Sequence, residues 1–306
     1  MLAIIAPGQG SQTPGMLSAW LEDAALKTLA QEFSDAIGLD VVRLGTTADA
    51  DEIKDTANAQ PLIVAAGLLS AYALGERDHI SFVAGHSVGE ITAAALAGVI
   101  SSIDAMTLVR MRGVEMAKAA AITPAGMAAV LGGDRQVVLS AIQALGLVAA
   151  NDNGGGQIVA AGDLNALAQL APDGARVRSL AVAGAFHTSY MQSAVDPLRT
   201  LADSIFTNTP IVGVISNKDG DVIKDGHDVL QRIIAQIANP VRWDLCMQTL
   251  LSQGVTGVIE VAPAGTLVGL IKRATPTIEQ FALKGPADIA SARLFIAQHG
   301  GNNVRN

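Results

Sequence analysis

The chain has a single cysteine, Cys246, and few aromatic side chains, which make up 3% of its 306 residues. One cysteine excludes an internal disulfide and argues against a cysteine–histidine metal cluster, so no metal site is expected. Charged residues are also scarce, at 16%, whereas half of the residues are hydrophobic. Aliphatic side chains must therefore fill the core, as they do in α/β proteins whose parallel strands are buried.

Positive charge is also in short supply, because the formal net charge is −8. A nucleic-acid partner would require a dense lysine and arginine footprint, so this composition argues against one. Residues 1–10 have no basic leader and do not resemble a secretory signal. The longest apolar stretch, residues 61–74, is too short to span a bilayer. We therefore expect a cytoplasmic protein that does not enter the membrane.

The N-terminal part of the chain alternates between short apolar runs and longer helical patterns. Residues 1–6 form an apolar run that stops at Pro7-Gly8, which indicates a buried strand followed by a loop. A second buried strand is expected at 80–84. Helices are expected at 59–74, 90–97 and 104–121.

The middle of the chain has a different order of predicted elements. Strand-like and helix-like segments follow one another as β-α-β-β-α-β, the pattern of a ferredoxin-like unit. We interpret residues 125–183 as a small domain inserted into a larger α/β domain formed by 1–124 and 184–306. The six predicted segments of the insert are 127–131, 134–145, 147–151, 157–161, 164–170 and 176–182.

The larger domain resumes after the insert with the same mixture of helices and strands. Strands are expected at 211–216 and 255–261. Helices are expected at 193–205, 229–237 and 244–252. The polar tail 300–306 is expected to be loose.

The sequence Gly85-His86-Ser87-Val88-Gly89 is a G-x-S-x-G motif between an apolar strand and a helix. This context is what a nucleophile elbow requires, because the turn presents the serine hydroxyl at a helix N-terminus. The glycines on both sides let neighbouring chain pass close to the serine. The motif alone is short and also fits a structural glycine-rich turn.

An unactivated serine needs a general base, and the chain offers five histidines. His299 is assigned to the tail, and His79 and His227 to exposed segments. His86 adjoins the serine, but neighbouring side chains at a sharp turn point apart. His187 lies among small residues that permit close approach, so it is the favoured base, although a buried or capping histidine is the alternative.

An α/β-hydrolase would place an acidic residue between the serine and the histidine in chain order. The acidic residues there, Asp134, Asp152, Asp163 and Asp173, all fall inside the predicted insert. The sequence therefore favours a Ser-His dyad over the triad of an ordinary esterase.

Several motifs together give a much more specific signal than the serine motif alone. Their order and spacing cover almost the whole chain, which on this basis resembles the bacterial malonyl-CoA:acyl-carrier-protein transacylases, the acyltransferases of type II fatty-acid synthesis. The motifs are Ala6-Pro7-Gly8-Gln9-Gly10-Ser11-Gln12, Gly85-His86-Ser87-Val88-Gly89-Glu90, Met111-Arg112-Gly113, Ala150-Asn151-Asp152-Asn153, Gly184-Ala185-Phe186-His187 and Asn239-Pro240-Val241-Arg242-Trp243.

The resemblance implies an α/β fold with a large α/β-hydrolase-like domain, a parallel sheet and a small ferredoxin-like insert. It implies that Ser87 is the acylated nucleophile and His187 its base. The backbone carbonyl of Gln236 would replace the usual acid in orienting the imidazole. The backbone N–H groups of Gln9 and Val88 would form the oxyanion hole.

The resemblance also implies a set of substrate-binding residues. Arg112 would pair with the free carboxylate of the malonyl group, and guanidinium binds carboxylate bidentately. Without the resemblance, Arg112 would be read as a surface residue of its helix. Asn151 and Asn153 would lie near the cleft, and Phe186 would crowd an α-methyl group, which favours malonyl over methylmalonyl.

The substrates implied are malonyl-CoA and the phosphopantetheine thiol of acyl carrier protein, with no permanently bound cofactor. We expect a monomer, although the sequence does not determine the oligomeric state. A serine thioesterase or esterase with the same elbow is the main alternative, and an inactive carrier-protein-binding scaffold is another. Because acyl carrier proteins are acidic, the basic pairs Lys272-Arg273 and Arg176-Arg178 are candidate docking sites, with solvated surface charges as the alternative.

Overall fold

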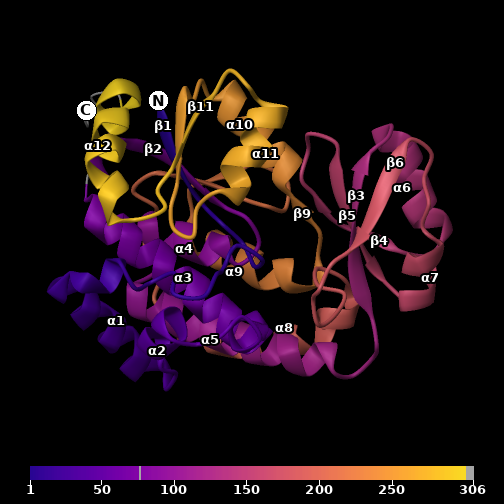
Figure 1. Ribbon diagram of the computed structural model, residues 1–306, viewed down its shortest axis with the longest axis horizontal. Coiled ribbons are helices and arrows are strands. Elements are labelled where there is room, and N and C mark those ends of the chain that lie inside the picture. Colours follow the sequence, from indigo (N-terminus) through magenta and orange to yellow (C-terminus); the bar gives the residue numbers. More distant parts are fainter. Residues whose placement is uncertain (76, 301–306) are drawn as a thin grey trace.

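The computed structural model describes residues 1–75 and 77–300 and contains two β-sheets in a mixed α/β arrangement (Figure 1). The larger sheet has the strand order β11-β10-β1-β2-β7-β8. Its strands are parallel except for β8, which pairs antiparallel with β7. These strands are β1 (Leu2–Ala6), β2 (Ile80–Gly85), β7 (Gly213–Ile215), β8 (Val222–Ile223), β10 (Gly257–Glu260) and β11 (Glu279–Ala282).

The larger sheet is buried on both faces, which explains why its strands read as continuous apolar runs. Along β1, Leu2 and Ile4 join one hydrophobic core, whereas Ala3 and Ile5 join a second core on the opposite face. Successive side chains of a strand point to opposite faces, so every residue of β1 is a core residue.

Helices cover the two faces unequally. The residues of α10 (Trp243–Ser252) and α11 (Thr266–Ala274) contribute to the second core. The buried carboxylate of Glu260, at the end of β10, accepts the backbone N–H groups of Leu267 and Val268 and so fixes the start of α11. The helices that contribute to the first core are α1 (Ala24–Ile37), α2 (Val41–Thr46), α3 (Thr56–Leu74), α4 (Gly89–Leu96), α5 (Ser102–Ala120), α8 (Val195–Ala202), α9 (Gly226–Ala235) and α12 (Ile289–His299).

Helix α3 is the one described helix that is long and apolar enough, by length and composition, to cross a membrane. It begins at Thr56, five residues before the apolar stretch 61–74. The helix is therefore longer than the stretch that was judged too short to span a bilayer. In the fold, 78% of this apolar window is buried. A helix that is apolar all round is what the core of an α/β protein requires, so its hydropathy is explained by packing.

The smaller sheet has the order β6-β3-β5-β4-β9. Its first four strands are mutually antiparallel where they pair, and the order β-α-β-β-α-β along the chain is the one predicted from the sequence. Side chains of both α6 and α7 pack in the core against one face of this sheet. The elements are β3 (Gly126–Gly132), α6 (Arg135–Ala144), β4 (Val148–Asp152), β5 (Gln157–Gly162), α7 (Leu164–Gln169) and β6 (Ala175–Ser179).

The fifth strand of the smaller sheet comes from a distant part of the chain. Strand β9 (Val241–Arg242) pairs parallel with β4, and sequence reasoning did not predict it. The two residues are too few for a recognisable strand pattern. The domain boundaries at 125 and 183 stay a prediction.

Some predicted elements differ from the structure. Strand β6 ends at Ser179, so the predicted strand to 182 is three residues too long. His299 was assigned to a loose tail, but it is the last residue of α12 and is 8% exposed. Its Nδ1 atom lies 3.0 Å from Thr256 Oγ1. Helix α12 forms because Ala292 and Ile296 pack into the first core. Of the predicted tail, residues 301–306 lie outside the described residues.

Candidate active site

Ser87 lies at a sharp turn between the end of β2 and the start of α4. Its φ angle is +54°, a left-handed conformation that is strained for a residue with a side chain. A Cβ atom at Gly85 would lie 1.9 Å from the carbonyl carbon of Gly89, and one at Gly89 would lie 2.2 Å from the carbonyl oxygen of Ala6. Only glycine fits at both positions, so the two glycines of the motif are explained by close approach.

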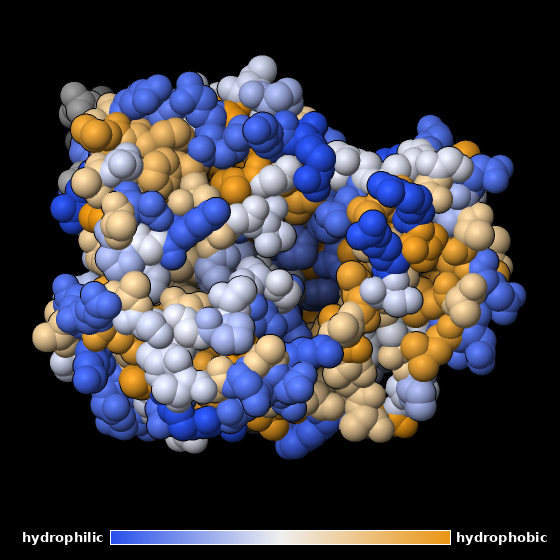
Figure 2. Space-filling view, viewed as in Figure 1, coloured by the Kyte–Doolittle hydropathy of each residue, from blue (hydrophilic) through white to orange (hydrophobic). Residues whose placement is uncertain are grey.

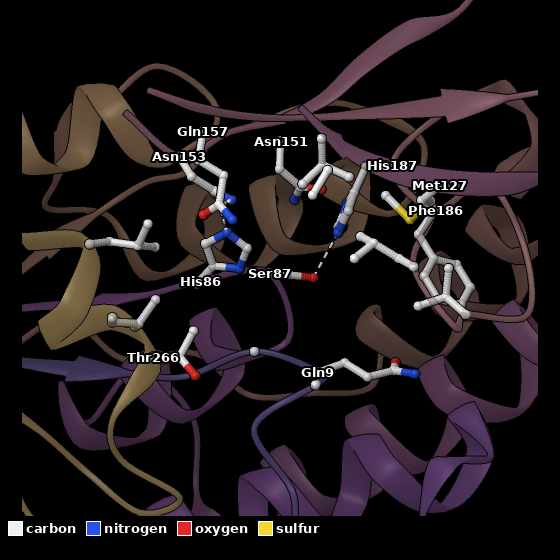
Figure 3. Close-up of a pocket in the computed structure, with 18 of the residues that line it drawn as sticks. Gln9, His86, Ser87, Met127, Asn151, Asn153, Gln157, Phe186, His187 and Thr266 are labelled. Atoms are coloured by element: carbon white, nitrogen blue, oxygen red, sulfur yellow. Dashed lines mark hydrogen bonds between the residues drawn. The ribbon is translucent and has the colours of Figure 1, made fainter. Parts of the chain in front are cut away.

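His187 is the histidine that the structure brings to Ser87. Its Nε2 atom lies 2.7 Å from Ser87 Oγ (Figure 3). Its Nδ1 atom lies 2.8 Å from the backbone carbonyl oxygen of Gln236. A carbonyl oxygen can only accept, so the proton of the neutral imidazole sits on Nδ1. The lone pair of Nε2 then faces the serine hydroxyl, which is the arrangement that a general base requires.

The other candidate residues for a triad are engaged elsewhere. Asp134 and Asp163 accept backbone N–H groups at the starts of α6 and α7, and Asp152 forms an ion pair with Arg135. Asp173 is exposed. The imidazole is therefore oriented by a backbone carbonyl in place of a carboxylate, as the dyad predicted from the sequence requires.

Burial makes His187 neutral over a wide pH range. The desolvation of its side chain, followed by the nearby charge of Arg112, lowers the pKa of His187 to about 3. The hydrogen bond to the Gln236 carbonyl opposes this shift in part. The imidazole is therefore unprotonated and ready to accept a proton at neutral pH.

Arg112 projects from α5 into the same site and is 1% exposed. Its guanidinium donates to Gln60 Oε1 at 2.5 Å, to Gln236 Oε1 at 3.0 Å and to Ser87 Oγ at 3.4 Å. Burial lowers the pKa of Arg112 to about 10, which still leaves it charged at neutral pH. Among the described residues no carboxylate forms an ion pair with it, so a buried cation faces the nucleophile with donor capacity for an anion.

A buried network that sequence reasoning missed holds the elbow in place. Asn217 Oδ1 accepts the backbone N–H of Ser87 at 2.8 Å, and Asn217 Nδ2 donates to the Gly85 carbonyl at 2.7 Å. Glu90 accepts the backbone N–H of Asn217 and, at 2.6 Å, the side-chain amide of Gln236. Burial raises the pKa of Glu90 to about 8, although these donors oppose the shift. The network thus links the serine backbone to the residue that orients the imidazole.

The sequence does contain weak signals for this network. Asn217 follows the apolar run that forms β7, at the carboxyl end of a parallel strand, where functional residues of open α/β sheets gather. Glu90 is the lone charge on helix α4. Gln60 similarly interrupts the apolar helix α3. Each is a polar residue in an apolar setting, and such a residue requires a buried partner.

Gln9 and Val88 lie on either side of Ser87. The loop after β1 runs close to the elbow, since a Cβ atom at Gly8 would lie 2.8 Å from the carbonyl oxygen of His86. Val88 is the residue before α4, where backbone N–H groups have no partner within the helix. Within residues 1–75 and 77–300, no hydrogen bond is formed by the backbone N–H of Gln9 or Val88.

The face of the smaller sheet without helices closes the other side of the site. Asn151 and Asn153, both nearly buried, line a cavity of about 260 Å³ together with Ser87, His187 and Phe186 (Figure 3). Asn153 Oδ1 lies 2.8 Å from His86 Nε2. His86 is therefore turned away from the serine, as predicted.

No metal centre is apparent at this cavity or elsewhere in the described part of the chain. The structure brings together no group of three or more histidine, cysteine, aspartate or glutamate side chains that could hold a metal ion. The lone cysteine, Cys246, is buried behind the elbow, and burial raises the pKa of its thiol well above the ordinary value.

Comparisons with known proteins agree with this geometry. The acyl transferase domain family matches residues 4–295. A malonyl CoA-acyl carrier protein transacylase from Mycobacterium bovis is 50% identical over 94% of this chain and 98% of its own length. The protein of the same name from Escherichia coli K12 is 34% identical over 95% of this chain and 98% of its own length.

Solved structures show the same fold. The crystal structure of MCAT from Mycobacterium tuberculosis superposes with a TM-score of 0.92 at 50% identity and covers 95% of this chain and 99% of that one. A complex of a malonyl-transacylase with its type II PKS acyl-carrier protein, PlMCAT:AntF, matches with a TM-score of 0.88 at 29% identity, covering 95% of this chain and 98% of that one. The chain therefore belongs to the acyl transferase family, the acyltransferases that include the malonyl CoA-acyl carrier protein transacylases.

Proposed function

We propose that this acyltransferase moves a malonyl group from malonyl-CoA to the phosphopantetheine thiol of an acyl carrier protein through a malonyl ester on Ser87. The names of relatives at 50% and 34% identity support this substrate pair. The observation that carries the proposal is the placement of Arg112, a buried guanidinium 3.4 Å from the Ser87 hydroxyl. A thioester with a free carboxylate fits that charge, whereas a neutral acyl group does not.

In the first half-reaction, His187 Nε2 accepts the proton of Ser87 Oγ as the oxygen attacks the thioester carbonyl. The carbonyl oxygen becomes an oxyanion, which the backbone N–H groups of Gln9 and Val88 would stabilise. When the tetrahedral intermediate collapses, the C–S bond breaks and the CoA thiolate takes the proton from the imidazolium. The products are malonyl-Ser87 and free CoA.

The second half-reaction runs the same chemistry with a new acceptor. The phosphopantetheine thiol gives its proton to His187 Nε2, and the thiolate attacks the ester carbonyl. The ester C–O bond then breaks, and the proton returns from the imidazolium to Ser87 Oγ. The thioester bond lost in the first step is regained in the second, so no energy source or resident cofactor is required.

Arg112 would select the acyl group by pairing with the malonyl carboxylate. Such a pair satisfies a cation that is otherwise short of a counter-charge, and two parallel N–H···O bonds would fix the acyl group over Ser87. Phe186, which lines the cavity beside His187, would crowd an α-methyl substituent. Asn151 and Asn153 would contact the substrate from the smaller sheet.

We further propose that the enzyme is a cytoplasmic monomer and that its product feeds fatty-acid chain elongation. The role in chain elongation follows from the resemblance of the chain to enzymes of type II fatty-acid synthesis. The proposals on transfer do not depend on them.

The test is to incubate the protein with malonyl-CoA alone and to measure its intact mass. We expect one malonyl group per chain, which peptide mapping places on Ser87, and which leaves when carrier protein is added. Ser87→Ala is the matched control and should remain unlabelled. A label at another residue, or an ester that water removes as fast as carrier protein does, would contradict the transferase and favour the hydrolase.

A further inference from the structure

Three arginines differ from the others in having no partner. Among the arginine side chains that the structure describes, Arg176, Arg178 and Arg273 form neither an ion pair nor a hydrogen bond. The remaining ones are held by carboxylates, backbone carbonyls or the active-site amides; they are Arg43, Arg110, Arg112, Arg135, Arg199, Arg232, Arg242 and Arg293. In a chain with a net charge of −8, unpaired guanidinium groups that share a location form a local positive surface.

Two of the three lie on the active-site face of the smaller sheet. Arg176 and Arg178 of β6 are directly opposite Leu131 and Ala129 of β3, and Ala129 lines the cavity. Val177, between them, packs on the other face against Val130 in the core beneath α6 and α7. Paired residues of neighbouring strands share a face, so the two arginines point to the cavity side of the sheet.

The chain after β6 leads from these arginines into the cavity. Leu180 and Val182 line it, and they follow Arg178 at the same spacing of two residues. Arg176 and Arg178 are exposed, which places them at the mouth of the cavity and outside its interior. Figure 2 shows strongly hydrophilic side chains over β6, beside the hollow between the two parts of the molecule.

The third arginine ends a similar row on the opposite wall. Thr266 and Leu270 of α11 line the cavity, and Arg273 follows them at helical spacing on the same face. The backbone of Gly155, in the turn between β4 and β5, lies against Arg273, because a Cβ atom at Gly155 would be 3.3 Å from that of Arg273. Lys272 is exposed and lies on the other side of the helix, two positions from Leu270.

We propose that Arg273 on one wall and Arg176 and Arg178 on the other form a docking surface for an acidic carrier protein, whose prosthetic arm then enters the cavity between them. This inference depends on the proposed function and names its partner surface. Of the two basic pairs predicted from the sequence, the structure favours Arg176-Arg178 as a whole but only Arg273 of Lys272-Arg273.

The spacing of the three arginines spreads positive charge over both sides of the cavity mouth, which suits the extended surface of an acidic protein. Arg176 is separated from Gln157, at the turn that contacts Arg273, by β3 and therefore by two strand spacings, on the order of 10 Å. Several carboxylates on the surface of a folded acidic protein can pair with guanidinium groups spread over both walls, and charge complementarity of this kind accelerates encounter and fixes orientation.

The experiment measures transfer from malonyl-CoA to two acceptors, holo carrier protein and free pantetheine, over a salt series. In the variant that combines R176E, R178E and R273E, we expect the KM for carrier protein to rise by about tenfold or more. The salt dependence of that KM should become weaker, and carrier-protein transfer should fall relative to pantetheine transfer. R273E alone is also measured, and its matched control is K272E, which makes the same charge change one residue away and should leave the KM for carrier protein unaltered.

Each other outcome contradicts the docking surface. If K272E acts as strongly as R273E, net charge alone is responsible. If the KM for malonyl-CoA rises and that for carrier protein does not, the arginines bind CoA phosphates. Thermal unfolding of each variant checks the fold, and the milder set R176Q, R178Q and R273Q should show the same order of effects. If wild-type enzyme acquires no malonyl group on Ser87, the proposed function fails, which is a separate result.

Discussion

The two walls of the cavity hold their polar groups in opposite ways. On the wall formed by the larger sheet, Ser87, Arg112 and Gln236 belong to one buried hydrogen-bonded network. On the wall formed by the smaller sheet, the polar groups in the cavity are neutral amides, such as those of Asn151 and Asn153, and the exposed Arg176 and Arg178 lie at the mouth.

The difference separates chemistry from recognition. A nucleophile, a base and a charge-pairing residue must keep fixed positions within fractions of an ångström, and a fully bonded buried network supplies that rigidity. Under the proposed function, the carrier protein and its phosphopantetheine arm enter and leave in each cycle, which suits apolar and exposed groups. Substitutions on the first wall should therefore lower the rate of acylation, and substitutions on the second should raise the KM for substrate.

The largest effect is expected from His187→Ala on the first wall. Removal of the general base should slow malonylation of Ser87 by about 10²- to 10⁴-fold. Single-turnover acylation followed by mass spectrometry measures this rate. His86→Gln is a matched control, because His86 faces Asn153 and should retain most of the activity. Near-normal acylation in His187→Ala would mean that another residue is the base.

Arg112→Ala should change which acyl group is accepted. A charge-assisted hydrogen bond contributes about 1.5–3 kcal/mol, so malonyl transfer should fall by roughly 10- to 100-fold while acetyl transfer is spared or improved. The ratio of kcat/KM values for malonyl-CoA and acetyl-CoA gives the answer. An equal loss for the two acyl groups would show that Arg112 only supports the fold.

Asn217 and Asn153 lie on opposite walls, so substituting each one tests the proposed division between chemistry and recognition. Asn217→Ala should lower the free energy of unfolding by about 1–3 kcal/mol, because it leaves the buried N–H of Ser87 and the carbonyl of Gly85 without a partner. It should also slow acylation. Asn153→Ala should act mainly on the KM for malonyl-CoA. Urea unfolding measures the stability of both variants, and steady-state kinetics gives their KM values. A larger loss of stability in Asn153→Ala than in Asn217→Ala would contradict the division between the walls.

The smallest effect is expected from pH. An ordinary histidine pKa would make the acylation rate rise through pH 6.5, but the pKa of His187 is lowered to about 3. The kcat/KM for malonyl-CoA should therefore be nearly flat between pH 5 and 7. The unfolded chain binds a proton on His187 below pH 6.5 and the folded chain does not, so stability should fall as pH decreases from 6.5 toward 3. A clear rise of the rate near pH 6.5 would contradict the lowered pKa.

Local patterns predicted most of the elements that carry the site. The strand before Ser87, the helix after it and the helix that carries Arg112 are each long apolar or periodic segments bounded by turn residues. The order of the elements of the smaller sheet along the chain, from β3 to β6, also agrees with the predicted β-α-β-β-α-β pattern. The elements that were not predicted are helices α1, α2, α11 and α12 and strands β8, β9 and β11. Helix α11 follows Gly265 without a side-chain cap, so no start signal marks it.

The residues that act through backbone atoms or long-range contacts were harder to predict. The role of the Gln236 carbonyl came from the resemblance, because any residue has a carbonyl group and no side-chain pattern can indicate one. Asn217 is 130 positions from the serine that it holds, and only the pairing of β2 with β7 brings them together. The position of Lys272 relative to Arg273 likewise required the helix that sequence reasoning missed.

Strand β9 has a consequence for motion between the two parts of the molecule. Its residue Val241 pairs with Asn151 of the smaller sheet, and the backbone N–H of Arg242 donates to the carbonyl of Asn217 at 2.7 Å. Five residues before β9 in the chain lies Gln236, whose backbone carbonyl orients His187. A hinge opening of the smaller sheet would therefore pull on the supports of both the nucleophile and the base. Any change in the angle between the two sheets is therefore coupled to the geometry of the catalytic pair.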